Sequence, residues 1–346
     1  MSIFDRIASL GHEQVIFCQE PASQYRAILC IHSTRLGPAI GGTRVLRYAS
    51  EEDALVDALR LSRAMTYKNA AAGLGVGGGK AVILAPEGDF DREKLFRAHG
   101  RAIDRLGGRF TTGEDVGTSP ADMEFVALET KWVGGRTGRA GGDPSPWTAL
   151  GVFCGMQAAA HAQWGSRDLR GRSVAIQGLG NVGMALGQHL HEAGARLIVA
   201  DVNVDRVRRA REAWDATSVE PDAVLAAEAD ILAPCALGGV LNDESVPRIR
   251  AQVVAGAANN QLLDDCHGAM LAGRGIVYAP DYIINAGGVL TAGVGLHGWS
   301  LAEVETKVRG IFDTVGEVLA LARRDGLPTN QAADRFAEIR LQPSGS

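Results

Sequence analysis

The sequence predicts an α/β protein of two domains, and three observations support that prediction. The chain has 346 residues, which exceeds one average domain and favours two. Short apolar segments typical of buried strands alternate with amphipathic segments of helical period. Residues 134–146 contain five glycines and two prolines, so we interpret this segment as the linker between the domains.

In the first half, residues 1–25 are expected to form a helix and then a strand. Ser50 is a plausible N-cap for the next helix, and Ser119 for a later one that has proline in its first position. The remaining expected elements are the strands Ala27–His32, Gly41–Val45, Ala81–Leu84 and Phe110–Val116, and the helices Glu51–Arg63, Asp91–Leu106 and Ser119–Thr130.

The second half shows the strand–helix–strand alternation of a parallel, doubly wound sheet. Its expected strands are Ser173–Gln177, Arg196–Asp201, Asp230–Ala233, Val253–Ala255 and Ile276–Ala279. Its expected helices are Trp147–Trp164, a helix ending near Glu192, one long helix Leu301–Arg324, and residues 328–341.

The composition excludes several classes of partner. A formal net charge of -5 and only 5% aromatic residues argue against nucleic acid and acidic membrane surfaces. Five cysteines without a Cys-x-x-Cys pair fit free thiols in a reducing cytoplasm. We expect neither an export signal nor a membrane span, and no metal site.

The segment Met65–Lys80 places Lys68 and Lys80 on either side of a predicted glycine-rich loop. A lysine in an apolar pocket beside another cation loses proton affinity and becomes a general base near neutral pH. The run Gly77–Gly79 lets the backbone approach a small ligand. The alternative is a surface turn with two solvated lysines.

A second motif, Gly178-Leu179-Gly180-Asn181-Val182-Gly183, follows a predicted strand, opens a predicted helix and precedes a strand that ends at Asp201. This context is that of the Rossmann dinucleotide site. Asp201 would bind the ribose hydroxyls and repel a 2′-phosphate, which favours NAD over NADP. Arg206, Arg208 and Arg209 weaken that preference, and a turn that is glycine-rich for packing alone is the alternative.

Together, the paired lysines and the later glycine motif resemble the Glu/Leu/Phe/Val dehydrogenase family of amino-acid dehydrogenases. The resemblance extends from about His12 to about Ala337 and is similar to the leucine enzymes and, in part, to the tryptophan and phenylalanine enzymes. Its matching segments are Met65–Lys80, Gly113–Thr118, Pro146–Gly155, Gly178–Gly183, Ala233–Gly239, Gly256–Gln261 and Tyr278–Gly288.

The resemblance implies a catalytic and oligomerisation domain (residues 1–134 with a C-terminal helix, about 326–346), an NAD-binding Rossmann domain (135–325) and an active-site cleft between them. Lys80 would be the base that activates water, Asp115 would exchange protons with the amino group, and Lys68 would bind the substrate carboxylate. Gly41 and Gly42 would lend backbone groups to the substrate, and Asn260 would lie where substrate and nicotinamide meet. The implied cofactor-binding residues are Gly178, Gly180, Asn181, Val182, Gly183, Asp201, Ala257, Asn259, Asn285 and Thr148.

The side-chain pocket implied by the resemblance is lined by Ile40, Gly113, Val289 and Ala292. The small residues Gly113 and Ala292 enlarge it, whereas Ile40 is bulky, so a broad specificity is expected. We expect leucine and other branched-chain amino acids first, with phenylalanine or tryptophan as the alternative. A homo-oligomer, from dimer to octamer, is implied. Two other functions stay open: a non-catalytic dinucleotide-binding sensor, and a hydroxy-acid dehydrogenase, for which no histidine motif is apparent.

Overall fold

The computed structural model describes residues 3–136 and 142–342, and the chain forms two compact units. Unit 1 comprises residues 1–142 and 340–346, and unit 2 comprises residues 143–339. The contacts therefore place most of the last helix with unit 2, whereas the sequence analysis assigned the C-terminal helix to the first domain. Within the described residues, no helix combines the length and apolar character needed to cross a membrane.

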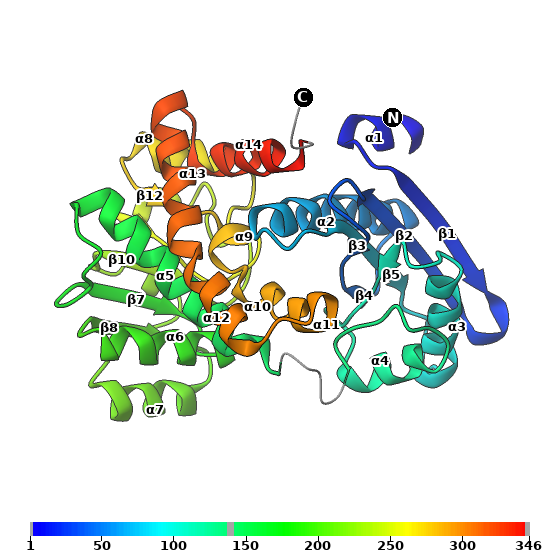
Figure 1. Ribbon diagram of the computed structural model, residues 1–346. Coiled ribbons are helices and arrows are strands. Elements are labelled where there is room, and N and C mark those ends of the chain that lie inside the picture. Colours follow the sequence, from blue (N-terminus) through cyan, green and yellow to red (C-terminus); the bar gives the residue numbers. More distant parts are fainter. Residues whose placement is uncertain (1–2, 137–141, 343–346) are drawn as a thin grey trace. The chain divides into compact units, whose positions relative to one another are not determined.

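Unit 1 is built on a mixed six-stranded sheet of order β1-β2-β5-β3-β6, with β4 paired to β5 (Figure 1). β1–β2 and β2–β5 are antiparallel, whereas β3 and β4 run parallel to β5. Its strands are β1 (Gln14–Glu20), β2 (Tyr25–Ser33), β3 (Ala39–Ile40), β4 (Thr43–Leu46), β5 (Gly77–Leu84) and β6 (Phe110–Thr111). Its helices are α1 (Ile3–Leu10), α2 (Glu51–Ala71), α3 (Arg92–Asp104) and α4 (Pro120–Ala127).

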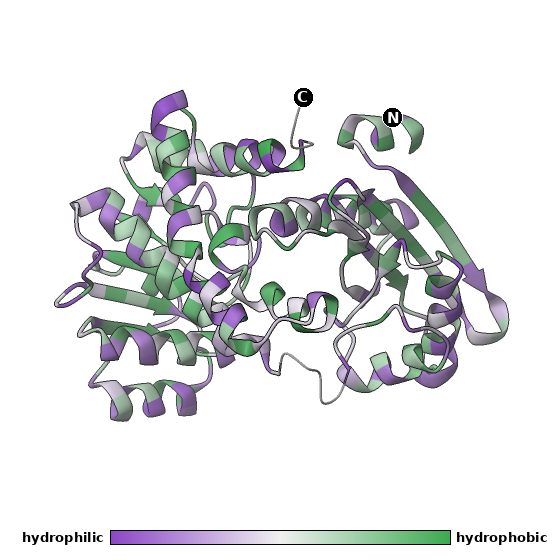
Figure 2. Ribbon diagram, viewed as in Figure 1, coloured by the Kyte–Doolittle hydropathy of each residue, from purple (hydrophilic) through white to green (hydrophobic). Residues whose placement is uncertain are grey.

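Two apolar clusters cover the two faces of this sheet. Ile28 and Val82 pack with Leu55 and Leu59 of α2. On the other face, Leu29, Ile31, Ile83 and Phe110 pack with residues of α3 and α4, including Phe96, Ile103 and Met123. The alternation of side chains along β2 and β5 produces this division, because successive residues of a strand point to opposite faces. Figure 2 shows the strands as predominantly hydrophobic.

Unit 2 contains six parallel strands in the order β12-β11-β10-β7-β8-β9, with helices packed around them (Figure 1). The strands are β7 (Ser173–Gln177), β8 (Arg196–Ala200), β9 (Thr217–Ser218), β10 (Ile231–Pro234), β11 (Val253–Val254) and β12 (Val277–Tyr278). The helices are α5 (Pro144–Trp164), α6 (Asn181–Glu192), α7 (Val204–Trp214), α8 (Cys266–Gly273), α9 (Asp281–Ile284), α10 (Gly287–Leu290), α11 (Ala292–His297), α12 (Leu301–Arg309), α13 (Ile311–Asp325) and α14 (Thr329–Leu341). The predicted α/β class and the Rossmann-type sheet are confirmed.

Several predicted elements differ from the structure. The helix expected to end at Arg63 continues to Ala71, so Lys68 lies in its last turn. The expected glycine-rich loop before Lys80 is wrong, because Gly77–Gly79 form the start of β5. A Cβ there would lie 2.0 Å from the Ser33 carbonyl oxygen at Gly77 and 2.1 Å from the Thr66 nitrogen at Gly78. Glycine is therefore required by close packing inside a strand.

Three further boundaries also differ. The strand expected over Phe110–Val116 is regular only at Phe110–Thr111, after which the chain makes isolated bridges and turns at Gly117 with φ near 79°. The long helix expected over Leu301–Arg324 is two helices that meet at Gly310. α5 begins at Pro144, because the Asp143 side chain caps it by accepting a hydrogen bond from the Ser145 N–H.

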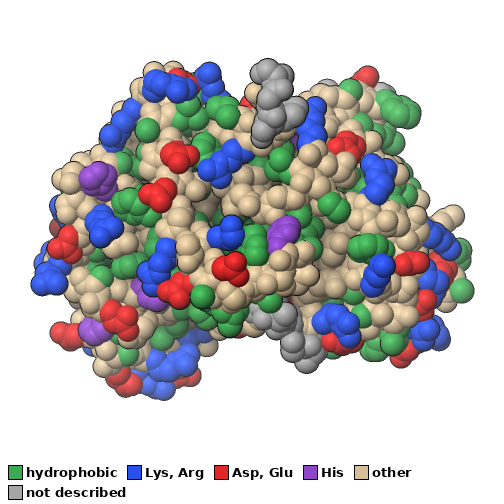
Figure 3. All heavy atoms as spheres, viewed as in Figure 1, with side chains coloured by type: hydrophobic (Ala, Val, Ile, Leu, Met, Phe, Trp, Pro, Cys, Tyr) green, Lys and Arg blue, Asp and Glu red, His purple; other side chains and the backbone are tan. Residues whose placement is uncertain are grey.

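On the face of the molecule shown in Figure 3, acidic and basic side chains are interspersed, which agrees with the small net charge.

Candidate active site

The Lys80 side chain is buried in the sheet of unit 1. β5 holds Lys80 opposite Cys30 of β2, and the next residue, Ala81, lies opposite Thr43 of β4. The Lys80 side chain is only 7% exposed, and its Nζ lies 2.6 Å from Oδ2 of Asp115. Because β5 pairs with β2 on one side and with β4 on the other, its register is fixed. The register in turn fixes the face of the sheet on which the Lys80 amine lies.

The protonation of this pair is set by burial and by neighbouring charges. Burial is the largest influence on Lys80 and lowers the pKa of its amine, the Asp115 carboxylate opposes that effect, and Arg44 adds to the lowering. Burial acts to raise the pKa of Asp115, but the charges of Lys80 and Arg44 outweigh it and hold that pKa below its ordinary value. A cation that acts on Lys80 is thus Arg44, whereas the sequence analysis paired Lys80 with Lys68.

Arg44 is a residue that the sequence analysis missed. Its Nε lies 3.3 Å from Asp115 Oδ2, and its Nη1 lies 3.0 Å from Asp57 Oδ2 on α2. The Tyr48 hydroxyl donates to the same Asp57 oxygen at 2.7 Å. The available signal was the strand pattern: Thr43 and Val45 are buried and Arg44 alternates with them, so its side chain leaves the strand on the opposite face.

Glycines bring the segment around Asp115 close to the sheet. A Cβ at Gly41 would lie 1.7 Å from the Gly79 carbonyl oxygen, and a Cβ at Gly42 would lie 2.8 Å from Cβ of Asp115. The Thr43 N–H donates to the Gly113 carbonyl at 2.8 Å. The structure thus brings the predicted residues Gly41, Gly42 and Asp115 together around Lys80.

Three other predicted residues of unit 1 are half-buried: Lys68 in the last turn of α2, Ile40 in β3, and Gly113 after β6. A Cβ built on Gly113 would meet only atoms at 3.7 Å or more, the nearest being the Gly134 carbonyl oxygen. Room for at least a Cβ atom therefore exists beside Gly113.

In unit 2, the turn Gly178–Gly183 has the geometry of a phosphate cradle. Gly178 has φ near 92°, which favours glycine, and a Cβ at Gly183 would lie 2.1 Å from the Gly178 carbonyl oxygen. A Cβ at Gly180 would meet no atom within 4 Å. Gly178 and Gly183 therefore serve the tight turn, and Gly180 faces open space at the N-terminus of α6, where N–H groups and the helix dipole favour an anion.

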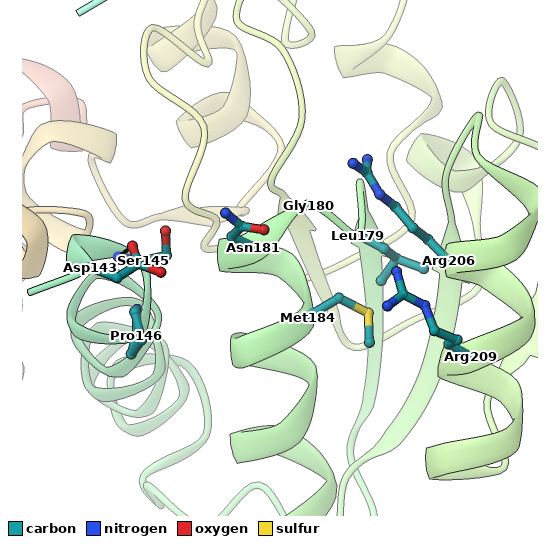
Figure 4. A pocket seen from close by; sticks show the side chains of 9 residues that line it. All are labelled: Asp143, Ser145, Pro146, Leu179, Gly180, Asn181, Met184, Arg206 and Arg209. Carbon is teal, nitrogen blue, oxygen red and sulfur yellow. Dashed lines mark hydrogen bonds between the residues drawn. The ribbon is translucent and has the colours of Figure 1, made fainter. Parts of the chain in front are cut away.

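A pocket of about 370 Å³ lies at this turn (Figure 4). The N-terminal ends of α5 and α6 contribute to it, and α7 contributes two arginines whose side chains extend toward Leu179 and Met184 (Figure 4). The lining residues are Asp143, Ser145, Pro146, Leu179, Gly180, Asn181, Met184, Arg206 and Arg209. Asp201 lies at the end of β8, and its Oδ2 accepts a hydrogen bond from the Leu179 N–H at 2.6 Å.

The remaining predicted residues of unit 2 form smaller groups. Asn285 Nδ2 donates to the Ala257 carbonyl at 3.1 Å and to Asn259 Oδ1 at 2.7 Å, so the structure brings these three together. Asn260 has φ near 51°, and its carbonyl accepts from the Gly239 N–H. Thr148 on α5 lies beside Gly288, where a Cβ would be 2.5 Å from its Oγ1. Val182 of α6, Val289 of α10 and Ala292 of α11 are half-buried.

A doubly wound unit with this glycine turn, together with a unit that buries a lysine against a carboxylate, defines an NAD(P)-dependent dehydrogenase. The model of the "Glu/Leu/Phe/Val dehydrogenase, dimerisation domain" matches residues 12–132, and that of "Glutamate/Leucine/Phenylalanine/Valine dehydrogenase" matches residues 141–204 and 200–338. The chain belongs to this family of amino-acid dehydrogenases, oxidoreductases that act on the CH–NH₂ group. The resemblance found in the sequence is confirmed.

Individual relatives agree with this assignment. The chain is 50% identical to leucine dehydrogenase of Geobacillus stearothermophilus, over 99% of this chain and 94% of that protein. It is 49% identical to valine dehydrogenase of Streptomyces albus, over 96% and 92%. The crystal structure of L-tryptophan dehydrogenase from Nostoc punctiforme is similar with a TM-score of 0.89 and 46% identity, and the match covers 98% of each chain.

Proposed function

We propose that this chain catalyses the NAD-dependent, reversible oxidative deamination of an apolar L-amino acid, with leucine and other branched-chain amino acids preferred. In this reaction the amino acid, NAD⁺ and water give the 2-oxo acid, ammonium, NADH and a proton. The observation that supports it most directly is the buried pair of Lys80 and Asp115. Family membership and 50% identity to a leucine dehydrogenase support the substrate class.

Lys80 is proposed as the base that takes a proton from the water attacking the imino carbon. A base must be uncharged to accept a proton, and burial favours the uncharged amine by lowering the Lys80 pKa. Asp115 stays ionised beside it, because the charges of Lys80 and Arg44 hold its pKa low. We assign to Asp115 the exchange of protons with the substrate's amino group, and to Arg44 the positioning of Asp115.

Several side chains and backbone groups are proposed to bind the substrate. Lys68 would bind the substrate carboxylate as a fixed cation, with backbone groups of Gly41 and Gly42 contributing. Asn260 would contact the substrate near the nicotinamide. The residues proposed to contact the substrate's side chain are Ile40, Gly113, Val289 and Ala292.

The turn and pocket of unit 2 fit a dinucleotide. A nicotinamide dinucleotide held there would supply the acceptor for the hydride that leaves the amino acid's α-carbon. The N-terminus of α6, with Gly180, Asn181 and Val182, would hold the pyrophosphate. Asp201 would bind the ribose hydroxyls, which supports NAD. The proposed contacts on the nicotinamide side are Ala257, Asn259, Asn285 and Thr148.

An aromatic substrate is the second candidate, and the space beside Gly113 favours it. We also propose that the chain forms a homo-oligomer, from dimer to octamer. The family model that matches residues 12–132 is described as a dimerisation domain, which supports this. The free cysteines support a cytoplasmic location.

The test is NADH formation at 340 nm with L-leucine, L-valine, L-phenylalanine and L-tryptophan. We expect turnover with leucine and valine, and Lys80→Ala should lower kcat by about 10²–10⁴-fold while NADH still binds. Lys94→Ala, which removes an exposed lysine paired with Asp91 on α3, is the matched control and should keep full activity. NADH binding without turnover on any amino acid would instead support the sensor. Full activity of Lys80→Ala would refute the assigned base.

A further inference from the structure

Two arginines of α7 face the dinucleotide pocket of unit 2. Arg206 and Arg209 are three positions apart, so they share one side of the helix. Both line the pocket together with Leu179 and Gly180, and Figure 4 shows them next to each other. In the described part of the chain, Arg209 makes neither a hydrogen bond nor an ion pair with any other residue. This cation is therefore available to a ligand.

The carboxylate of Asp201, which would repel a second phosphate, is largely compensated. Its Oδ2 accepts from the Leu179 N–H at 2.6 Å, and its Oδ1 accepts from the Asn203 N–H at 2.7 Å. Arg206 Nη1 lies 3.7 Å from Oδ2, and the Asp201 side chain is only 6% exposed. An anion entering the pocket would meet the arginines before it met this carboxylate, since Asp201 is not among the lining residues.

We propose that Arg206 and Arg209 bind the 2′-phosphate of NADP(H), so that this chain accepts NADP(H) as well as NAD(H). A phosphate monoester carries nearly two negative charges, and guanidinium groups bind such oxygens through parallel, charge-assisted hydrogen bonds. The inference rests on the proposed use of a dinucleotide at this turn. It adds that the α7 arginines offset the preference for NAD that Asp201 would impose.

Arg208 provides a matched control on the same helix. It is exposed, it does not line the pocket, and it pairs with Asp205 at 2.9 Å. Removing it takes away the same charge from the same helix and leaves the pocket unchanged. A general loss of positive charge therefore affects Arg208→Ala as much as the pocket variants, whereas loss of a specific contact does not.

The experiment is calorimetric titration of the full-length protein with NADH, NADPH, 5′-AMP and 2′,5′-ADP. For the unmodified chain, we expect the Kd of NADPH to lie within about tenfold of that of NADH. Arg206→Ala and Arg209→Ala should each weaken the binding of NADPH and of 2′,5′-ADP by about tenfold or more. This is the usual effect of losing a hydrogen bond to a charged group. In these two variants the Kd values of NADH and 5′-AMP should change by less than about threefold. The Arg208→Ala variant should bind all four ligands as the unmodified chain does.

Three results would overturn the inference. The first is NADPH binding more than about tenfold weaker than NADH binding to the unmodified chain. The second is an equal loss of affinity for NADH and NADPH in the Arg206→Ala and Arg209→Ala variants, which would mean that the arginines bind the pyrophosphate. The third is an Arg208→Ala variant that loses NADPH as much as Arg206→Ala does. If circular dichroism shows that a variant does not fold, the Kd values of 2′,5′-ADP and 5′-AMP for the unmodified chain are compared instead. Binding of 2′,5′-ADP that is weaker than binding of 5′-AMP would then overturn the inference.

The inference and the proposed function fail separately. Amino-acid oxidation with NAD, but no NADPH binding, would remove only the inference. Binding of both dinucleotides without oxidation of any amino acid would remove only the proposed reaction.

Discussion

Replacing Arg44 by glutamine should shift the activity of the enzyme to higher pH. Arg44 and Lys80 contact the same atom, Asp115 Oδ2, at 3.3 Å and 2.6 Å, so their nitrogens are at most 5.9 Å apart. The guanidinium charge therefore opposes protonation of Lys80, and it contributes to the lowered pKa of that amine. Without it the Lys80 pKa rises, and the uncharged amine becomes scarcer at neutral pH.

The size of the effect follows from this separation. Two unit charges about 6 Å apart at an effective dielectric constant near 20 repel by roughly 3 kcal/mol. The guanidinium charge is spread over three nitrogens and the side chain is 18% exposed, so about 1–2 kcal/mol is a realistic share. That corresponds to a loss of about 5- to 30-fold in kcat/KM at pH values where Lys80 is mostly protonated.

The assay is the pH profile of kcat/KM for the unmodified chain and for Arg44→Gln. The acid limb of the variant's profile should move to higher pH, and the two profiles should converge where Lys80 is uncharged in both. Arg60→Gln is the control, because Arg60 lies 3.7 Å from Asp57 and is 66% exposed. It should leave the profile in place.

A constant ratio of the two rates at every pH would contradict this reasoning, because it would mean that Arg44 acts only through geometry. So would an unchanged profile. The variant should also lose about 1–2 kcal/mol of stability in urea, since Asp115 and Asp57 each lose a partner while Asp57 keeps the Tyr48 hydroxyl.

Three other predictions concern the glycine turn and buried histidines. Gly183→Ala should destabilise the fold by about 1–3 kcal/mol in urea, because its Cβ would overlap the Gly178 carbonyl oxygen at 2.1 Å. Gly180→Ala should fold normally, because no atom lies within 4 Å of the position of its Cβ. It should bind NADH at least about tenfold more weakly in calorimetry. An unchanged affinity for NADH would show that Gly180 does not contact the phosphates. Burial lowers the pKa of His99 to about 3, and burial and a neighbouring histidine lower that of His32 to about 4. The unfolded chain therefore takes up more protons below pH 6.5, so stability should be complete above that pH and fall as the pH drops toward 4; His99→Gln should flatten the urea midpoints between pH 7 and 5.

The parts of the site that are formed by residues close together in the sequence could be predicted from the sequence alone. The strand, glycine turn, helix and following acid at Asp201 are all contained in about thirty residues with fixed spacing. The roles assigned to Asp115 and Gly113 came only from the family resemblance, because no local pattern links them to Lys80.

Long-range contacts explain what the sequence reasoning missed. The run Gly77–Gly79 looked like a loop, since glycine is rare inside strands. Its real cause is the close approach of Ser33 in β2 and Thr66 in α2, two elements that pack against β5 only in the folded chain. Arg44 looked like an ordinary strand residue, and its importance arises from Asp57 on α2 and Asp115 after β6, which only the folded sheet brings to it.

The placement of Lys80 inside a strand that is hydrogen-bonded on both sides has a practical consequence for redesign. Inserting or deleting a single residue in β5 would rotate the amine to the opposite face of the sheet, so this segment tolerates no change in length. Attempts to broaden or redirect substrate choice are therefore best confined to side-chain exchanges at residues proposed to contact the substrate, such as Ile40 and Gly113. Such exchanges would leave the position of the Lys80 amine unchanged while they alter the proposed contacts with the substrate's side chain.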